Sequence, residues 1–579
     1  MQPSSDQTGA SGGGGGLRRW GPIIAIVAVV AIVAGLVLFG GGDDDPEVSG
    51  GSETTETGGE LPEGAVTYAA AEAAGTLDDY TFEASCDTET GTLSLPVVSP
   101  PDCFADVEDN GGETAPGVTA DSVKVVVYLA QENDIVLNFI TAPIDADDSP
   151  AQVRETYQGY ADMFNEVYQT YGRTIELEFL DASGLSTDEV SARADAVKAM
   201  DEMGAFAVWG GPVLSNAWTE EIKARGGVCI GCPALADGPP STFQITPSAT
   251  QIRLQFAEYL SKKLLGKPAV HAGDEAFHDR ERVFGALYID TGSQDSLDGA
   301  EETRKVLADV DIELAEQIGY ELDPATLAEQ ATTAISRLKE SGVTTVLIGG
   351  DPIAPKTFTE VATQQGYFPE WVLNGAALQD TTAFGRTYDQ DQWSHAFGLS
   401  SLAARVVNGK GSAENLYQWW AGEYPPADDT VGVLFPNPLM FFTGIQAAGP
   451  NLTVETFRDG MFFAGTPEFR AVTEQVITFG NSEVWPNLAD YLSKVDHQGI
   501  DDMTELWWDP TVEGNDEIRK PGTGMYRYVD GGRRYLPGEW SEELRVFDPD
   551  GTSTVYDDLP EGEELPNVPP PAGSPAAGG

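Results

Sequence analysis

Basic residues are scarce in this chain. Its 579 residues include 32 lysines and arginines against 93 acidic residues, which gives a formal net charge of −61 at pH 7. A surface of this sign repels nucleic acid and anionic lipid headgroups, so a nucleic-acid partner is excluded. The acidity keeps an exposed domain soluble and carries no information about the fold.

Motifs of common enzyme classes are also missing. The chain has no phosphate-binding loop, no HExxH and no dinucleotide-binding GxGxxG. Histidine is rare as well. His271 and His278 flank a GDEAF stretch without a recognised metal-ligand spacing, which favours an exposed loop over a metal site. We therefore predict a protein that is not an enzyme, with no catalytic residue, no cofactor and no metal.

Cysteine occurs only as two local pairs, Cys86 with Cys103 and Cys229 with Cys232. An even count outside the cytoplasm favours disulfides, and a bond between Cys86 and Cys103 would close a stretch with little core of its own. Cys229 and Cys232 have the spacing of a thioredoxin-like redox pair, but Cys229 lies at the end of a predicted strand instead of opening a helix. A structural disulfide is the preferred interpretation. A redox site, free thiols and a metal site are the alternatives.

A long apolar run occurs once, at residues 21–39. At about 1.5 Å per residue it is long enough to cross a bilayer core. Arg18 and Arg19 precede it and three aspartates follow it, so the positive-inside bias keeps the N-terminus cytoplasmic and places the C-terminal domain outside. A cleaved signal peptide and a buried core helix are the alternatives, and no cysteine near the end of the run could take a lipid. We predict an uncleaved, single-pass anchor in the cell membrane.

Composition divides the ends of the chain into segments. Residues 1–20 form a Gly/Ser-rich cytoplasmic tail, 21–40 the transmembrane anchor and 41–64 an acidic linker. Residues 65–117 form a preamble that holds the first cysteine pair. The Pro/Gly/Ala-rich residues 551–579 are predicted to be a disordered tail.

Between these ends, apolar strands alternate with amphipathic helices. Residues 123–129 are rich in β-branched side chains, as strands are, and residues 150–171 place their aromatic side chains on one side of a helix. Ser186 and Glu189 form a cap signal for the next helix. The alternation restarts near residue 249, and two rounds of it predict an α/β fold with two doubly wound lobes. The predicted strands are 123–129, 174–180, 206–209, 228–230, 285–288, 312–320, 345–348 and 371–373, and the predicted helices are 150–171, 187–202, 216–225, 249–265, 296–308, 326–341 and 354–365.

Several stretches of the chain stand in a characteristic order. They are DNGGETAPGVTADSVKVVVYL (109–129), GRTIELEFLDASG (172–184), AFAVWGGPVLSNA (205–217), GGVCIGCPAL (226–235), FQITPSATQ (243–251), ISRLKESGVTTVLIGGDP (335–352), WWDPTVEGNDE (507–517) and MYRYVDGGRRYLPGEW (525–540). Through these stretches, residues 117–540 resemble the type I extracytoplasmic substrate-binding proteins of ABC importers, of the branched-chain amino-acid-binding, leucine-binding-protein-like class.

The resemblance implies a type I periplasmic-binding-protein fold, preceded here by one transmembrane helix. Lobe I would take residues 118–249 and 402–480, and lobe II residues 250–401 and 481–550. The chain would cross between the lobes three times, with a ligand cleft between them. Residues 481–505 fit the family pattern poorly and are expected to be an insertion.

Ligands of open α/β sheets bind beyond the carboxyl ends of the strands. The candidate ligand-binding residues at these ends are Ser215, Asn216 and Ala234 in lobe I and Asp290, Ser293 and Asp351 in lobe II. The resemblance implies that the first three hold the carboxylate of an amino acid, Ala234 through its backbone N–H. The hydroxyl that the family carries just after Ala234 and its lobe II acid near Ala376 are missing, and Asp290 and Asp351 are the nearest acidic substitutes. An apolar or amide-like small molecule therefore fits as well as an amino acid, and a turn or helix-cap role is the alternative for each residue.

We predict a membrane-tethered receptor that captures a small organic solute and delivers it to the permease and ATPase subunits of an ABC importer. The same ectodomain used as a sensor without transport is the first alternative, and neighbouring permease and ATPase genes would favour import. A membrane-anchored thiol oxidoreductase that uses Cys229 and Cys232 is the second.

Overall fold

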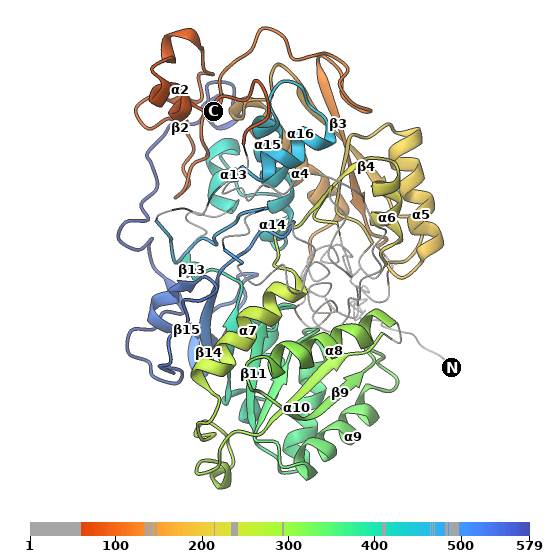
Figure 1. The fold of residues 1–579 in the computed structure, drawn as a ribbon, viewed down its shortest axis with the longest axis vertical. Coiled ribbons are helices and arrows are strands. Elements are labelled where there is room, and N and C mark those ends of the chain that lie inside the picture. The colour runs from red at the N-terminus through yellow and green to blue at the C-terminus, as the bar shows by residue number, and fades with distance from the viewer. Residues whose placement is uncertain are drawn as a thin grey trace, which may run out of the picture.

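The computed structural model describes residues 60–578, with gaps at 133, 135–137, 139–141, 143, 145–146, 213–214, 233–240, 292–293, 408–412, 464, 466, 468, 481–483 and 486–496, and without the side chains of residues 294 and 295. The predicted cytoplasmic tail, the transmembrane anchor and most of the acidic linker lie outside the described residues. The described chain forms lobe I, in the upper half of Figure 1, and lobe II, in its lower half.

The preamble is a small unit stapled onto lobe I. Its Cys86–Cys103 disulfide is formed, with the two Cα atoms 5.6 Å apart, which confirms that predicted pair. Leu93, Leu95 and Cys103 pack into the main core of lobe I. Because the segment has few apolar residues of its own, the disulfide and this borrowed core hold it in place. Its elements are α2 (Tyr68–Ala74), η1 (Leu77–Asp79), β1 (Cys86–Asp87) and β2 (Thr92–Leu93).

Lobe I is built on a five-stranded parallel sheet in the order β4-β3-β5-β6-β7. The strand β3, second in this order, is buried over most of its length, as its valine-rich sequence requires. One face is covered by α4, α13, α14, α15 and α16, and the other by α5 and α6. The bounds are β3 (Ser122–Leu129), β4 (Thr174–Asp181), β5 (Ala207–Trp209), β6 (Val228–Ile230), β7 (Thr242–Phe243), α4 (Pro150–Val167), α5 (Glu189–Val197) with the π-helical turn η2 (Lys198–Glu202), α6 (Ala217–Ala224), α13 (Ala413–Ala421), α14 (Val431–Leu434), α15 (Pro436–Ala448) and α16 (Val454–Met461).

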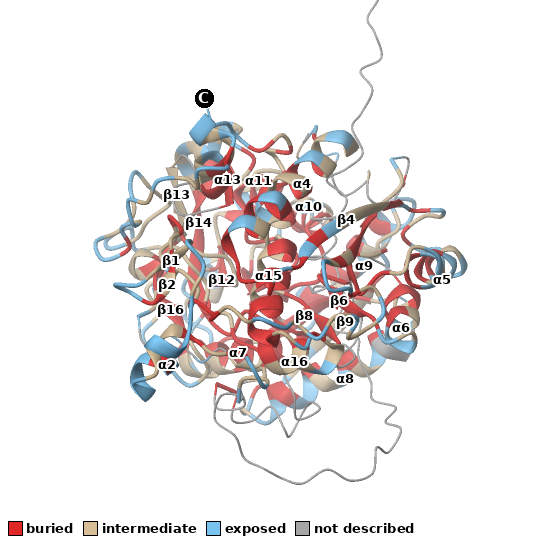
Figure 2. Cartoon of the chain, turned by 90° about the horizontal axis from the view of Figure 1, so that it is seen from above, coloured by how far each residue is buried: buried red, intermediate tan, exposed pale blue. Residues whose placement is uncertain are grey.

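The helix α15 is largely apolar and lies among buried residues at the centre of the molecule (Figure 2). Within the described part of the chain, the stretch Val431–Ala448 is the one helical segment whose length and composition would allow it to cross a membrane. Of its residues 67% are buried inside the protein, which is the setting of a core helix.

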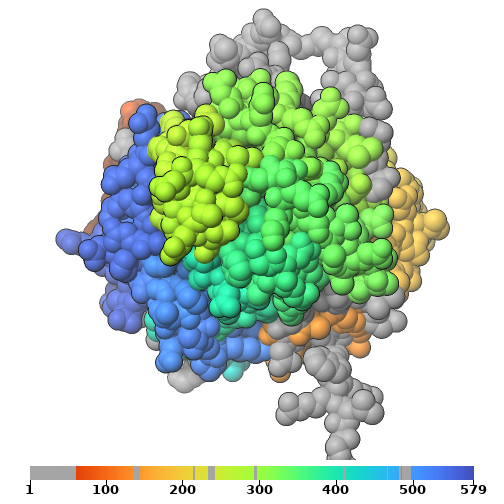
Figure 3. Space-filling view, turned by 90° about the horizontal axis from the view of Figure 1, so that it is seen from below, coloured from red at the N-terminus to blue at the C-terminus, as the bar shows by residue number. Residues whose placement is uncertain are grey.

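Lobe II is built on an eight-stranded mixed sheet in the order β15-β14-β12-β11-β10-β8-β9, with β16 paired to β14. The strands β8 to β12 are parallel, while β14 and β15 run antiparallel to their neighbours. Val346 and Ile348 of β10 face the side of α9 and α10, and Leu347 faces the side of α7 and α8, so helices cover both faces. From below, the C-terminal residues, in blue, lie beside the green residues of lobe II (Figure 3).

The elements of lobe II agree with the predicted alternation. The strands are β8 (Phe284–Ile289), β9 (Leu314–Tyr320), β10 (Thr345–Ile348), β11 (Glu370–Gly375), β12 (Ala396–Ser400), β14 (Met503–Asn515), β15 (Pro521–Tyr528) and β16 (Arg534–Tyr535). The helices are α7 (Ala249–Lys263), η3 (Glu275–Phe277), α8 (Gln294–Ala308), α9 (Leu327–Glu340), α10 (Ala354–Gln364), α11 (Thr382–Gly385), α12 (Gln390–Trp393) and η6 (Val529–Gly532).

The segments that connect the lobes are bonded to one another. The N–H groups of Gly499 and Ile500 donate to the carbonyls of Gln244 and Ile245, each at 2.8 Å. Arg534 donates to the carbonyl of Leu402 and to the carboxylate of Asp502, each at 2.7 Å. The chain leaves the parallel strands β7 and β12 at their carboxyl ends to make these crossings. The carboxyl ends of the parallel strands of both sheets therefore face the space between the lobes.

The start of α5 differs from the predicted cap. Asp188, not Ser186, caps this helix, and its carboxylate accepts the N–H groups of Val190 and Ser191 at 3.1 and 3.2 Å. Ser186 is buried and donates its N–H to the carboxylate of Asp134 instead. The contact with Asp134 engages Ser186, so the cap lies two residues later, at Asp188. The local sequence around Ser186 contains no sign of this contact.

The C-terminal segment also differs from the disordered tail that its composition predicts. Its strand β17 (Val555–Tyr556) pairs with β13 (Arg405–Val406) on a crossing segment, and η7 (Ala576–Gly578) ends the described chain. The buried carboxylate of Glu563 accepts the N–H groups of Val472 and Thr473 at 2.8 and 3.2 Å. The indole of Trp419 in α13 donates to the carbonyl of Val568 at 2.9 Å. The tail therefore makes a further connection, from lobe II back to lobe I, and its last turn, η7, lies beside α13.

Candidate functional site

The carboxyl edges of the two sheets carry the turns at which a ligand would be held. Gly231, after β6, has φ 63°, and a side chain there would overlap the amide of Asn437. Gly349, after β10, has no room for a Cβ either, because the amide of Asn374 packs against its Cα. Glycine at both positions lets a polar amide from another element approach the strand end.

In lobe I, the structure places Ser215 and Asn216 at the start of α6, after β5. Ser215 is buried, and its hydroxyl accepts the N–H of Ala217 at 3.1 Å, which is a helix-capping contact. Asn216 is partly exposed at the N-cap position. Ala234 lies outside the described residues. Ser215 thus makes the helix-cap contact that was the alternative to ligand binding. Asn216 is the more accessible of the two residues.

The Cys229–Cys232 disulfide is formed at the same edge, with Cα atoms 5.6 Å apart, which confirms the second predicted pair. Both residues are buried, at 1% and 0% exposure, and belong to the core on the α5 and α6 side. Cys229 lies within β6 and not at a helix start. This setting is that of a structural bond, because a redox pair needs an accessible, electropositive thiol.

In lobe II, Asp290 follows β8 and is partly exposed. Its N–H donates to the carbonyl of Tyr320 at 2.8 Å, and its carboxylate accepts the hydroxyl of Ser296 at 3.0 Å. Ser293 lies outside the described residues. Asp290 is the one predicted acidic residue of this lobe that reaches solvent.

Asp351 follows β10 and is fully buried. One carboxylate oxygen accepts the N–H groups of Ile353 and Ala354 at 2.7 and 2.6 Å, at the start of α10, and the other accepts the phenol of Tyr320. Burial raises the pKa of Asp351, and these three hydrogen bonds oppose the rise. In this arrangement Asp351 caps the helix α10, as the alternative to ligand binding predicts. A contact between Asp351 and a ligand stays a prediction.

Polar residues that the sequence did not single out complete this edge. Tyr320 ends β9, and Gln379, in the loop after β11, donates its amide N–H to the carbonyl of Asp351 at 2.6 Å. The Oε1 atom of Gln379 is buried and has no hydrogen-bond partner among the described residues. In lobe I, Asn437 at the start of α15 donates to the phenol of Tyr157 at 3.2 Å. No local signal marks these residues, because each comes to the edge from a different element.

The described strand-end loops are poor in positive charge. Among the described residues that follow β3, β5, β6, β8, β10 and β11, the only cation is Lys356, and it pairs with Glu360 along α10. The phenol of Tyr128, at the end of β3, has its pKa raised by burial and by the nearby carboxylates Asp195, Asp134 and Asp188. Backbone N–H groups at helix starts, not side-chain cations, are thus the donors that these loops offer to a ligand oxygen.

The histidines weighed as metal ligands are held by other contacts. The ring of His278 bonds the carbonyl of Ala272 at 2.7 Å, and the ring of His271 lies 4.9 Å from that of Phe547. Burial lowers the pKa of His271 to about 4, so it is neutral at pH 7. In the described part of the chain, no group of three or more His, Cys, Asp or Glu is arranged to hold a metal ion.

Comparison with known families and curated proteins finds no match for this chain. Solved structures do match it. A solute-binding protein of an ABC transporter from R. palustris, in complex with 4-hydroxybenzoate, is 10% identical, with 70% of this chain and 97% of that chain covered and a TM-score of 0.46. A branched-chain amino acid transporter substrate-binding protein from Streptococcus pneumoniae, in complex with isoleucine, is 14% identical over 72% of this chain and 100% of that chain, with a TM-score of 0.44. A substrate-binding protein from Aeropyrum pernix is 12% identical over 67% and 92%, with a TM-score of 0.47.

Many of the structural neighbours are binding proteins of ABC transporters, the class that the sequence resembles. At these identities the likeness concerns the fold.

Proposed function

We propose that this protein is a membrane-tethered, extracytoplasmic receptor that captures a small organic molecule between its lobes and delivers it to an ABC importer. The ligand class is an amino acid or an amide-like molecule. Residues 21–39 form the tether, residues 41–64 the linker, and the permease and ATPase subunits are the partners.

The observation that carries this proposal is the direction of the parallel strands in the two sheets. The chain crosses between the lobes from the carboxyl ends of β7 and β12, so both carboxyl edges face one shared space. Open α/β sheets bind ligands beyond this edge, and a two-lobed protein can close on a ligand by rotation about its crossings. Ile144, in the segment that follows β3, packs against the core of lobe II, which supports a space bounded by both lobes.

The chemistry of the edge supports a ligand that needs no side-chain cation. Asp290 in lobe II is suited to an ammonium or amide N–H, and backbone N–H groups near Asn216 in lobe I to a carboxylate or amide oxygen. Two of the three neighbours described above hold 4-hydroxybenzoate and isoleucine, which are small organic molecules.

A thermal-unfolding screen of the full chain in detergent tests the binding proposal. The panel holds amino acids, amides, polyamines, aromatic acids and short aliphatic acids, and intrinsic tryptophan fluorescence reports unfolding. A ligand present at 100 times its Kd adds about 2.7 kcal/mol to the free energy of unfolding. At least one compound class is expected to raise the melting temperature, and Asp290→Asn should reduce that rise, whereas the exposed control Glu340→Gln should leave it unchanged. Flat responses across the panel would contradict the proposal.

The tether is tested by fractionation of cells that express the full chain. The protein is expected in the membrane fraction and resistant to alkaline carbonate extraction, and deletion of residues 1–40 behind a cleavable signal should release it. Recovery of the full chain in the soluble fraction would overturn the proposed anchor.

A further inference from the structure

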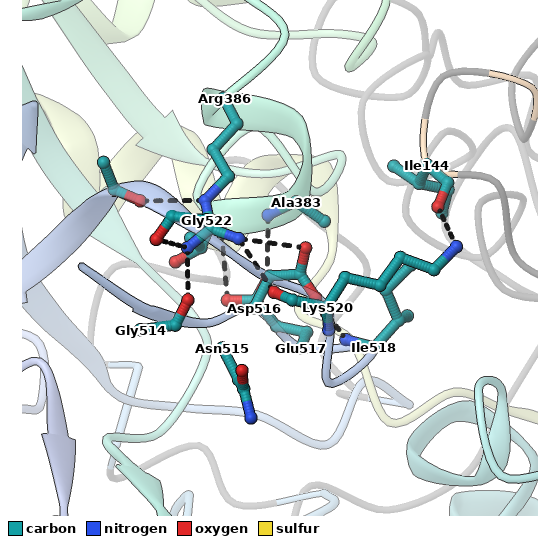
Figure 4. Close-up of polar contacts among 12 residues, drawn as sticks. Ile144, Ala383, Arg386, Gly514, Asn515, Asp516, Glu517, Ile518, Lys520 and Gly522 are labelled. Carbon is teal, nitrogen blue, oxygen red and sulfur yellow. Dashed lines mark hydrogen bonds and ion pairs between the residues drawn. The ribbon is translucent and has the colours of Figure 1, made fainter.

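The hairpin of β14 and β15 ends in a tip, residues 516–520, that is fixed rigidly to lobe II. The guanidinium of Arg386 donates to the carbonyls of Gly514, Lys520, Gly522 and Gly524 at 2.8 to 3.0 Å and pairs with the carboxylate of Asp516 (Figure 4). Asp516 also accepts the N–H groups of Ile518 and Lys520 at 3.2 and 2.8 Å, which closes the turn. One partly buried cation, Arg386, and one carboxylate, Asp516, thus set the shape of the tip.

Glu517 provides a second anchor to lobe II. Its two carboxylate oxygens accept the N–H groups of Thr382 and Ala383 at 3.0 and 2.9 Å, at the start of α11 (Figure 4). Arg405, on the crossing segment, donates to the carbonyl of Asn515 at 3.0 Å and pairs with Glu517 at 3.4 Å. The tip therefore moves with lobe II.

Two cations of this tip reach lobe I. Arg519 donates to the carbonyl of Asp428 at 2.6 Å and pairs with the carboxylates of Asp428 and Asp429 at 2.5 and 3.4 Å. The ammonium of Lys520 donates to the carbonyl of Ile144 at 2.8 Å, in the segment that follows β3 (Figure 4). Asp428 and Asp429 lie between α13 and α14, so these bonds join the two lobes.

The receiving face of lobe I is acidic and is itself held in place. The carboxylate of Asp148 accepts the N–H and the hydroxyl of Thr430 at 2.8 and 2.7 Å, and Asp429 accepts the N–H of Asp147 at 3.1 Å. Burial and the charges of Asp428 and Asp147 raise the pKa of Asp429, while Arg519 lowers it. Asp147, Asp148, Asp428 and Asp429 thus form a concentration of negative charge that the cations of lobe II offset.

Arg519 itself has a strained backbone. Its φ is 61°, in the left-handed region that glycine adopts freely and other residues rarely do. The hydrogen bonds around Asp516 hold this conformation, and it directs the Arg519 side chain toward lobe I.

We propose that the tip at residues 516–520 is an electrostatic latch between the lobes, in which Arg519 and Lys520 hold lobe I through Asp428, Asp429 and the Ile144 carbonyl. The latch rests on the proposed function, because a receptor that captures a ligand between its lobes must change the angle between them. Because both sides are fixed to their own lobes, a rotation beyond the reach of these side chains must break the contacts. The latch thus sets how readily the lobes change their angle before a ligand arrives.

The distance between the lobes in the ligand-free full chain tests the latch. The described cysteines are all in disulfides, so spin labels at Val190→Cys in α5 and Ala328→Cys in α9 report one distance by pulsed electron resonance. Both positions are exposed and lie outside the latch. In the parent at low salt we expect one narrow distance distribution. At 1 M salt it should broaden, because the Debye length falls from about 10 Å at 0.1 M to about 3 Å.

Charge variants then assign the effect to the latch. Arg519→Glu on lobe II and Asp428→Lys on lobe I should each shift the balance between lobe arrangements about two- to fivefold, as expected for a partly exposed pair. The double variant, which restores opposite charges, should recover the parent distribution. Arg519→Gly should free the lobes while relieving backbone strain, so its melting temperature should not fall. Arg337→Glu, which breaks an exposed pair with Glu316 inside lobe II, is the matched control and should have no effect.

Identical distributions in the parent, Arg519→Glu and Asp428→Lys would overturn the latch. So would an equal broadening in Arg337→Glu, since that would show a general loss of stability. No ligand enters this measurement, so a failed ligand screen would contradict the proposed function and leave this result standing by itself.

Discussion

The phenol of Tyr320 donates a hydrogen bond to the carboxylate of Asp351, and both side chains are buried at the carboxyl edge of the lobe II sheet. The second oxygen of Asp351 holds the first N–H groups of α10. Asp351 therefore links an edge strand to a helix start, and its effect on any ligand passes through the loop that it positions.

Replacement of Asp351 should cost stability in proportion to the bonds lost. Asp351→Ala removes the helix cap and leaves a buried phenol unpaired, so we expect a loss of about 2–4 kcal/mol in the free energy of unfolding. Asp351→Asn keeps an acceptor for the N–H groups and should lose about 1 kcal/mol. Denaturant unfolding measures both. Asp188→Ala, which removes an exposed cap on α5, is the control and should lose less than Asp351→Ala. Equal losses at the two caps would contradict the role assigned to Asp351.

Asp501, which follows the crossing residues Gly499 and Ile500, should make stability depend on pH. It accepts the hydroxyl of Thr478 at 2.5 Å and the indole N–H of Trp485 at 2.7 Å, and burial raises its pKa to about 7. The unfolded pKa is about 3.9, so the folded state binds the proton more tightly. The contribution of Asp501 to the free energy of unfolding is complete below about pH 4. It is lost as the pH rises through about 7, and the total loss is up to about 4 kcal/mol.

Asp501→Asn tests this dependence, since asparagine resembles the protonated acid. The variant should be more stable than the parent above pH 7 and should show a flatter stability curve between pH 4 and 7. Chemical unfolding at several pH values measures both curves. A variant whose curve keeps the slope of the parent would show that another group titrates there.

Glu563 should anchor the C-terminal segment. Its carboxylate is buried and accepts two backbone N–H groups, at Val472 and Thr473. Glu563→Gln exchanges one acceptor oxygen for an amide N–H, which opposes a donor, so we expect a loss of about 1–3 kcal/mol and faster proteolysis of residues 551–578. Glu561→Gln, at an exposed position two residues earlier, should behave as the parent. Equal proteolysis of the parent and both variants would indicate that the tail is not held by Glu563.

The Cys229–Cys232 bond should resist reduction. Both sulfurs lie in the core beside α5 and α6, so a thiol reagent reaches them only after local unfolding. In redox buffers the folded protein should require a potential below about −300 mV, as structural disulfides do. A potential near −200 mV would revive the oxidoreductase alternative. Cys86–Cys103 in the small preamble serves as the internal comparison, and its loss should cost about 2–4 kcal/mol.

The pattern of residues in the chain was sufficient to predict the alternating strands and helices, the two lobes and both cysteine pairs. β3 and α4, for example, follow from a run of valines and from aromatic residues at helical spacing, and such periodicity is set by near neighbours. The positions of Asn216 and Asp290 at strand ends follow as well, because the carboxyl end of a parallel strand is a local feature.

Tertiary structure alone decided what those side chains do. Asp351 was predicted at the right edge, but its burial depends on Tyr320 and α10, and the cap of α5 moved to Asp188 because Ser186 is engaged by Asp134. The tail looked disordered because proline and glycine give it no core, yet β13, Val472 and Trp419 supply its partners from far along the chain. Composition and periodicity reflect the local conformational preference of a segment. A hydrogen bond across the fold depends in addition on where the partner segment lies in the tertiary structure.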